Sequence, residues 1–206
     1  MKHTAIMIIS AIAMIVLAGC RKPTTNIDMT NDEGKPVIAL DYRDFDKAAT
    51  AMVESLMRSG VLKKKDGSRY VVATGRIIND TMQRIDTDQL MAKVEQEMMN
   101  SGQVVMTSAV GGRGATDVMI DEMRNIRDSA QAEEFAGQTL PEKGQLVAPE
   151  LSMSGKIIQR NIRYDKDTEQ IEYYFQLQLT EIASGLRFWQ EEKIIGKRGD
   201  RRNVSW

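Results

Sequence analysis

The stretch Tyr173–Thr180, YYFQLQLT, alternates between apolar and mostly polar side chains. Alternate residues of a β-strand share one face of the sheet. The stretch therefore predicts a strand with one apolar face, formed by Tyr173, Phe175, Leu177 and Leu179, and one mostly polar face. A sheet built from such strands needs helices on one face only, which favours an α+β layer.

Two further strands are predicted around this stretch. Leu151–Ile157 alternates cleanly, and Tyr164–Thr168 has the polar composition of a hairpin tip. On the other side, a tight turn at Ala183–Gly185 precedes a return strand over Leu186–Ile195. Three consecutive strands are thus expected to close the chain.

Helical spacing of apolar residues appears earlier in the sequence. Asp44–Ser59 carries an apolar stripe at i, i+3, i+4 spacing and is followed by Gly60 as a stop signal. A second helix is predicted from a cap at Asp86 or Thr87 to Asn100, with Gly102 as its stop. The residues expected to face inward on it are Leu90, Met91, Val94 and Met98.

Two short apolar runs and a third helix complete the pattern. Tyr70–Ile78 is suited to a strand buried on both faces, and Val104–Thr107 to a short strand. The third helix is expected to start at Thr116 or Asp117 and to reach about Phe135. Its predicted inward stripe is Val118, Ile120, Met123, Ile126 and Ala130.

The fold class predicted from these elements is α+β. We expect a single domain over residues 37–206, with one mixed β-sheet of about four to five strands and about three helices packed on it. The glycine-rich stretch 111–114 lies between a predicted strand and the third helix. It lacks the Lys-Ser/Thr pair of a phosphate-binding loop, so it is interpreted as a surface loop.

The first 19 residues have the pattern of a secretory signal peptide. A basic start is followed by an apolar run from Ala5 to Leu17, too short to span a bilayer core. The sequence Leu17-Ala18-Gly19-Cys20 resembles a bacterial lipobox, in which cleavage falls between Gly19 and Cys20. The Cys20 sulfur is then the predicted lipidation site, and two or three acyl chains would hold the protein on a membrane. Arg21 after the cysteine favours the outer membrane, by resemblance to enterobacterial sorting patterns.

Residues 20–36 are predicted to form a lipidated, disordered tether. Arg21–Pro36 is polar and has almost no apolar side chain to bury. Fully extended, sixteen residues reach at most about 55 Å. The tether is expected to precede the folded domain from Val37 onward.

Composition argues against several classes of function. The only histidine, His3, lies in the signal peptide, and the only cysteine is the predicted lipid site. Ser–His and Cys–His catalysis, the usual zinc sites and an internal disulfide are therefore not expected. With 28 Lys and Arg against 29 Asp and Glu, the chain also lacks the basic excess typical of nucleic-acid binding. We predict no enzyme activity, no cofactor, no metal and no small-molecule substrate; a carboxylate-based wall hydrolase is a minor alternative.

Two stretches resemble the LpoB family of outer-membrane lipoproteins, which activate peptidoglycan synthases. The first, beginning at Val72, is an apolar strand ending in Asn79-Asp80-Thr81, a helix entry at Ile85–Asp88, and a helix exit at Asn100-Ser101-Gly102 before a short strand. The second, Leu151–Lys197, has a strand with Ser154-Gly155, a Tyr-rich strand, a Ser184-Gly185 turn and Trp189 near the head of the return strand. Each of these positions also has an ordinary role in folding.

The resemblance implies a periplasm-facing lipoprotein that binds and stimulates a bifunctional, class A penicillin-binding protein. Its partner-binding residues are not identified by the sequence. The tether departs from the family, because well-known members have a long Pro-rich tether and this one has only Pro23 and Pro36. A structural lipoprotein of a cell-envelope assembly or secretion complex is the alternative function.

Overall fold

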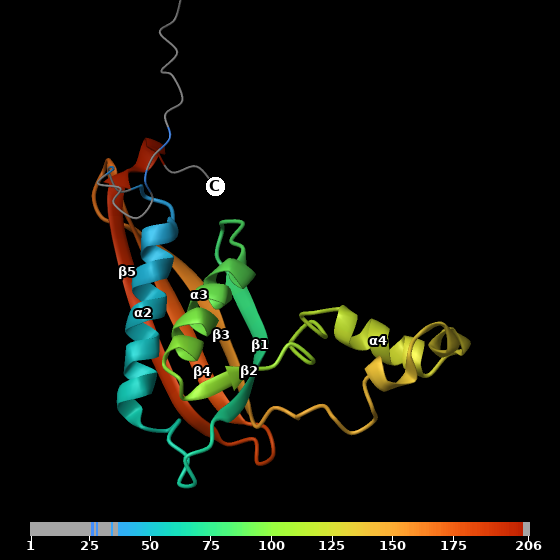
Figure 1. The fold of residues 1–206 in the computed structure, drawn as a ribbon. Helices are drawn as coiled ribbons and strands as arrows, with labels where there is room; N and C mark the ends of the chain where they lie inside the picture. Colours follow the sequence, from blue (N-terminus) through green and yellow to red (C-terminus); the bar gives the residue numbers. More distant parts are fainter. Residues whose placement is uncertain (1–25, 27, 29–33, 35–36, 204–206) are drawn as a thin grey trace, which may run out of the picture. The chain divides into compact units, whose positions relative to one another are not determined.

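Five strands form one mixed sheet in the order β2-β1-β3-β4-β5 (Figure 1). The computed structural model describes residues 26, 28, 34 and 37–203. β1 (Tyr70–Asp80) pairs in parallel with β2 (Val104–Met106) and with β3 (Leu151–Arg163). β4 (Thr168–Glu181) and β5 (Arg187–Asp200) continue the sheet in antiparallel fashion. The predicted α+β fold with one mixed sheet is confirmed.

The strand that contains YYFQLQLT is β4, which lies between β3 and β5 in the sheet. Its predicted apolar residues, Tyr173, Phe175, Leu177 and Leu179, are all buried, whereas the alternate residues are half-buried. β3 and β5 run further than the sequence predicted, because pairing with β4 continues as far as Arg163↔Glu169 and Thr168↔Asp200. Those outer residues are largely polar, so the apolar alternation that marks a strand is weak there.

Two helices cover one face of the sheet (Figure 1). α2 (Tyr42–Ser59) begins at a capping box between Asp41 and Asp44 and ends at Gly60, whose φ is 72°. A positive φ is easily reached only by glycine, so Gly60 ends the helix as predicted. α3 (Thr87–Asn100) is capped by the Asp86 side chain, which accepts hydrogen bonds from the amides of residues 88 and 89. Both predicted helices are confirmed.

The core lies between these helices and the inner face of the sheet. α3 buries all four residues predicted to face inward, and Trp189 on β5 is only 8 % exposed. The Phe45 ring on α2 meets the Phe175 ring edge to face at 6.0 Å. Apolar burial of this kind is the main stabilising contribution in a domain of this size. The buried residues of α2 that join the core are Ala48, Ala49, Met52, Val53 and Leu56.

The expectation for Tyr70–Ile78 was correct for the first half of the strand only. Val72 and Ala73 point to opposite faces and are both buried, but Ile78 is exposed. The register between β1 and β3 shifts between Thr74 and Ile77, which marks a β-bulge. Beyond the bulge, one face of β1 is open, and an apolar run in the sequence does not reveal that.

The predicted third helix is wrong in its bounds and in its burial. α4 covers only Met119–Arg127, and Asp117 accepts a hydrogen bond from the Met119 amide at 3.0 Å. Short 3₁₀ turns follow at Ala130–Glu134 (η1) and Gly137–Thr139 (η2), and Arg201–Asn203 (η3) follows β5. None of α4, η1 and η2 contains a buried residue. We call residues 108–147, between β2 and β3, the arm.

Candidate partner-binding surface

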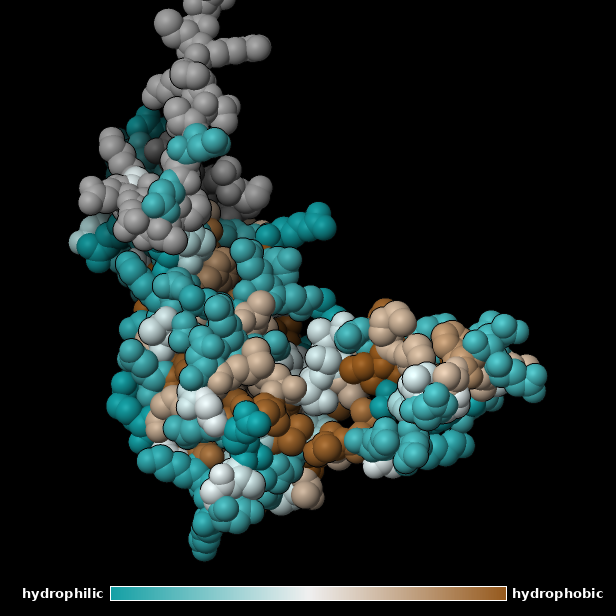
Figure 2. Space-filling model, viewed as in Figure 1, coloured by the Kyte–Doolittle hydropathy of each residue, from teal (hydrophilic) through white to brown (hydrophobic). Residues whose placement is uncertain are grey.

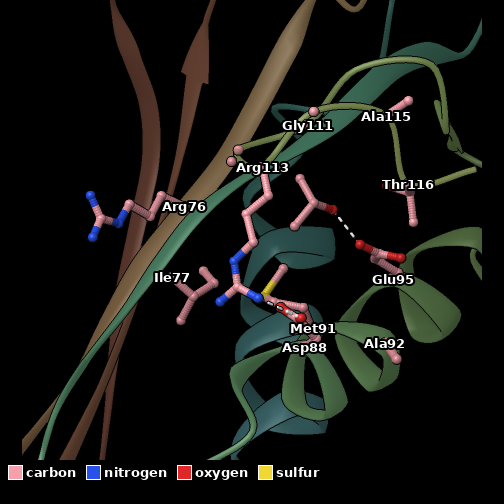
Figure 3. Close-up of a pocket in the computed structure, with 14 residues that line it drawn as sticks. Arg76, Ile77, Asp88, Met91, Ala92, Glu95, Gly111, Arg113, Ala115 and Thr116 are labelled. Atoms are coloured by element: carbon pink, nitrogen blue, oxygen red, sulfur yellow. Dashed lines mark hydrogen bonds and ion pairs between the residues drawn. The ribbon is translucent and has the colours of Figure 1, made fainter. Parts of the chain in front are cut away.

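A recess of about 450 Å³ lies where the arm leaves the sheet (Figure 3). Its walls come from β1, α3 and the loop Gly111–Thr116. Thr74 on β1 and Glu95 on α3 are joined by a hydrogen bond from the Thr74 hydroxyl to the Glu95 carboxylate. The recess is therefore a meeting point of the sheet, the helix layer and the start of the arm.

The glycine-rich loop is packed against β1. The Gly112 amide donates to the Thr74 carbonyl at 2.8 Å. Five residues earlier in the chain, the Thr107 amide donates to the Val72 carbonyl at 2.9 Å. A Cβ on Gly112 would lie 2.6 Å from the Gly75 carbonyl carbon and 2.7 Å from the Arg76 nitrogen. Only a residue without a side chain permits this approach. The predicted loop is confirmed, and its glycine fixes the arm to the edge of the sheet.

Both carboxylates that line the recess are engaged in contacts within the protein. Glu95 accepts from Thr74, and Asp88 pairs with Arg113 at 2.8 Å. The Asp88–Arg113 pair is largely exposed, so its contribution to stability is small. Figure 3 shows Arg113 reaching across the recess toward Asp88, whereas Arg76 points away on the other side of β1. The first contact joins β1 to α3, and the second joins the loop Gly111–Thr116 to α3. Both therefore fix the positions of the walls of the recess.

The arm is held together mainly by local contacts. Arg127 donates to the Pro141 carbonyl at 3.2 Å and pairs with Asp128 at 2.7 Å, and Lys143 lies 3.4 Å from the same carboxylate. The hydrogen bond from Arg127 lowers the pKa of Asp128 to about 2, so this carboxylate is charged at neutral pH. The arm thus has an ion-paired cluster of its own, which joins the end of α4 to residues 141–143.

Large apolar side chains of the arm are exposed to solvent. Val118 is 71 % exposed, Val147 67 % and Met119 53 %. Leu146, Val110 and Phe135 are also exposed. Figure 2 shows hydrophobic side chains gathered between the β2 side of the sheet and α4. Contiguous exposed apolar surface of this kind marks an interaction site more often than scattered single residues do.

The open face of the sheet has a different character, because several of its polar side chains are paired with one another. Lys156 pairs with Asp80 at 2.5 Å, and Gln178 donates to Ser154 at 3.0 Å. The Tyr174 hydroxyl donates to Glu172 at 2.6 Å, and this hydrogen bond lowers the pKa of the Glu172 carboxyl. A sheet face with mutually satisfied polar groups is suited to contact with water.

The segment that precedes α2 in the domain, from Val37 onward, is tied to β5. The Lys197 ammonium is only 10 % exposed, donates to the Val37 and Ala39 carbonyls at 2.9 and 2.7 Å, and pairs with Asp44. Burial opposes ionisation of the neighbouring Asp41, but the Arg43 hydrogen bond and the Lys197 charge outweigh it and lower the pKa of Asp41. This cluster joins the first described residues of the domain to its last strand.

The site residues predicted from the sequence, Gly19 and Cys20, lie outside the described residues. In the part of the chain that the structure describes, no helix is both long and apolar enough to cross a membrane. Nor do the described side chains include a group of three or more His, Cys, Asp or Glu that could hold a metal ion. The arm was missed as a candidate surface because its helical apolar stripe was interpreted as core. The sequence offered no signal that separates this stripe from the stripes of α2 and α3.

Several solved structures are similar to this chain at low sequence identity. No curated protein matches the chain. Similar solved structures include the LpoB C-terminal domain from Escherichia coli, at 12 % identity and a TM-score of 0.43, covering 75 % of this chain and 99 % of that one. Lipoprotein GNA1162 from Neisseria meningitidis aligns at 10 % identity and a TM-score of 0.33, covering 66 % of this chain and 87 % of that one.

A family model described as "Peptidoglycan-synthase activator LpoB" matches residues 44–195. The matched segment begins in α2, includes the whole arm and ends in β5. Because this match spans well over half of the 206-residue chain, the chain belongs to the LpoB family of peptidoglycan-synthase activators.

Proposed function

We propose that this chain is an outer-membrane lipoprotein that binds and stimulates a bifunctional, class A penicillin-binding protein from the periplasmic side. The observation that carries the proposal is the family-model match over residues 44–195. The family is one of regulatory activators, which agrees with the proposal that this chain is not itself an enzyme.

Each segment of the chain is proposed to have a separate role, in the order of the sequence. Residues 1–19 direct export and are removed, Cys20 carries the lipid, and residues up to 36 are the tether. The domain from Val37 onward binds the synthase. The Lys197 ammonium on β5 donates hydrogen bonds to the carbonyls of Val37 and Ala39, which follow the proposed tether. A pull on the tether would therefore be passed to β5 through these hydrogen bonds. The synthase must come within reach of a tether of about 55 Å at full extension plus the domain itself.

Stimulation requires that the domain bind one conformation of the synthase more tightly than the other. A partner with equal affinity for both conformations would shift nothing, however tightly it bound. A tenfold preference for the active conformation corresponds to about 1.4 kcal/mol. Docking therefore favours the active synthase, and glycan polymerisation and cross-linking proceed faster.

The test uses the mature, lipidated chain in detergent with the class A penicillin-binding proteins of its host. We expect one of them to be retained on the immobilised chain and its polymerisation rate to rise several-fold. Mass spectrometry should find acyl chains on Cys20, and a Cys20→Ser variant should leave the membrane fraction. Absence of both binding and stimulation would contradict the proposal, and ring-shaped particles in electron micrographs would favour a structural envelope assembly instead.

A further inference from the structure

The arm combines exposed apolar side chains with carboxylates that have no partner. Its residues contain seven acidic and four basic side chains. All four basic side chains are engaged: Arg113 by Asp88, Arg127 and Lys143 by Asp128, and Arg124 by the Ile120 carbonyl at 2.5 Å. Five of the carboxylates have no hydrogen-bond or ion-pair partner among the described residues: Asp121, Glu122, Glu133, Glu134 and Glu142.

This combination distinguishes the arm from the open face of the sheet. Ile194, on that face, is 51 % exposed, close to the 53 % of Met119 in the arm. Near Ile194, however, the carboxylate of Glu192 accepts a hydrogen bond from Gln176 at 2.6 Å. The carboxylates Glu172 and Glu192 of the sheet face are thus engaged within the protein, while the free carboxylates of α4 and η1 remain available to a partner.

The arm is also positioned firmly enough to present a surface. The Thr116 amide donates to the Ser108 carbonyl at 2.9 Å and closes its base, and Gly112 fixes that base on β1. An interface needs such preorganisation, because ordering a flexible segment on binding costs affinity. The arm therefore has a fixed base, an apolar surface and uncompensated negative charge.

We propose that the arm is the docking element for the synthase, and that it binds an apolar patch rimmed by Lys and Arg side chains. This inference rests on the proposed function and names the surface that performs it. Val118 and Met119 would be buried in the centre of the interface, where apolar contacts contribute most. The free carboxylates of α4 and η1 would face the basic rim and accelerate association.

The experiment measures the dissociation constant of the mature full-length chain for the synthase, together with stimulation of polymerisation. The double variant Val118→Ser/Met119→Ser should bind at least tenfold more weakly. The variant Glu133→Lys/Glu134→Lys should also bind more weakly and should lose most of the salt dependence shown by the unmodified chain. The matched control Ile194→Ser should bind as the unmodified chain does. Circular dichroism of every variant verifies that its domain is folded.

Each outcome supports or overturns the proposal. If the unmodified chain and Val118→Ser/Met119→Ser bind and stimulate equally, the docking proposal is wrong while the proposed function stands. If Ile194→Ser is the variant that loses binding, the partner uses the open sheet face, and the docking proposal is again wrong. Self-association that disappears in the arm variant would show that the arm binds a second copy instead. If the unmodified chain neither binds nor stimulates, the proposed function fails and the docking proposal with it.

Discussion

Some single side chains join parts of the chain that are distant in the sequence. Lys197 on β5 is the clearest example, because the ammonium of this side chain, which is only 10 % exposed, contacts two carbonyls before α2 and the Asp44 carboxylate. The strength of such a contact depends on its burial. A buried charge that loses its partner is costly, whereas a surface pair is screened by water.

We predict that Lys197→Met lowers the free energy of unfolding by about 3 kcal/mol, because the buried Asp44 side chain would lose its cationic partner. The control is Lys93→Met, which removes a lysine that is 35 % exposed from Asp46 and Glu97 and should cost about 0–1 kcal/mol. Urea denaturation of both variants measures the difference. Equal losses in the two variants would show that burial does not strengthen the Lys197 contacts.

Asp128 gives a residue-scale prediction for pH. Its pKa in the folded protein is about 2, below the ordinary value of 3.8, because Arg127 and Lys143 stabilise the charged form. Its contribution to the stability of the arm is therefore complete above pH 4 and is lost as the pH falls through 2. Carboxyl NMR should find a titration midpoint near 2, and Arg127→Met should raise that midpoint toward 3.8. An unchanged midpoint in the variant would contradict the ion-paired cluster of the arm.

At the scale of elements, alternation along β5 separates buried from exposed residues. Trp189 is 8 % exposed in the core, while Phe188, which lies at a register irregularity, is 36 % exposed. We expect Trp189→Ala to lower the free energy of unfolding by about 3–5 kcal/mol, because it leaves a large cavity. Phe188→Ala should cost about 0.5 kcal/mol, as surface substitutions usually do. Thermal and urea denaturation test the pair, and comparable losses would contradict the assigned facing of the strand.

The attachment of the arm to β1 depends on a second element-scale contact. Gly112→Ala would place a methyl group within 3 Å of the Gly75 and Arg76 backbone, and we predict a loss of about 1–3 kcal/mol. Gly137→Ala, in η2, meets nothing within 4 Å and should be nearly neutral. Hydrogen exchange should show that the residue 112 amide loses protection only in the first variant. Retained protection there would mean that the arm is attached by other contacts.

Elements that face the core were predictable from the sequence, because burial imposes a regular spacing on apolar residues. The stripes of α2 and α3, Gly60 and the Asp86 cap are examples. α4 has a similar stripe, but its helix ends at Arg127 and its apolar residues do not join the core. The spacing of apolar residues predicts that a helix forms, but it does not show which surface the apolar side of the helix contacts. The exposed half of β1 escaped prediction for the same reason, since an apolar run does not reveal an open face.

The candidate surface was not predictable in the same way. The sequence indicated a lipoprotein of the LpoB family and left the partner-binding residues unidentified. The arm emerges as a surface only when burial and pairing are known, because its carboxylates become distinctive by having no partner in the fold. Charge counts along the sequence cannot distinguish such groups from those of Asp44 or Asp128, which are engaged.

At the scale of the whole molecule, the domain is proposed to act as a tethered regulator whose only output is the activity of its partner. Its sheet and its two covering helices form a stable base, and its arm presents the surface proposed for docking. The most direct measurement is the polymerisation rate of a class A synthase titrated with the mature chain. We predict a saturable, several-fold increase that the Val118→Ser/Met119→Ser variant reproduces only at a concentration at least tenfold higher. A rate that stays flat at every concentration of the unmodified chain would contradict its role as a synthase activator.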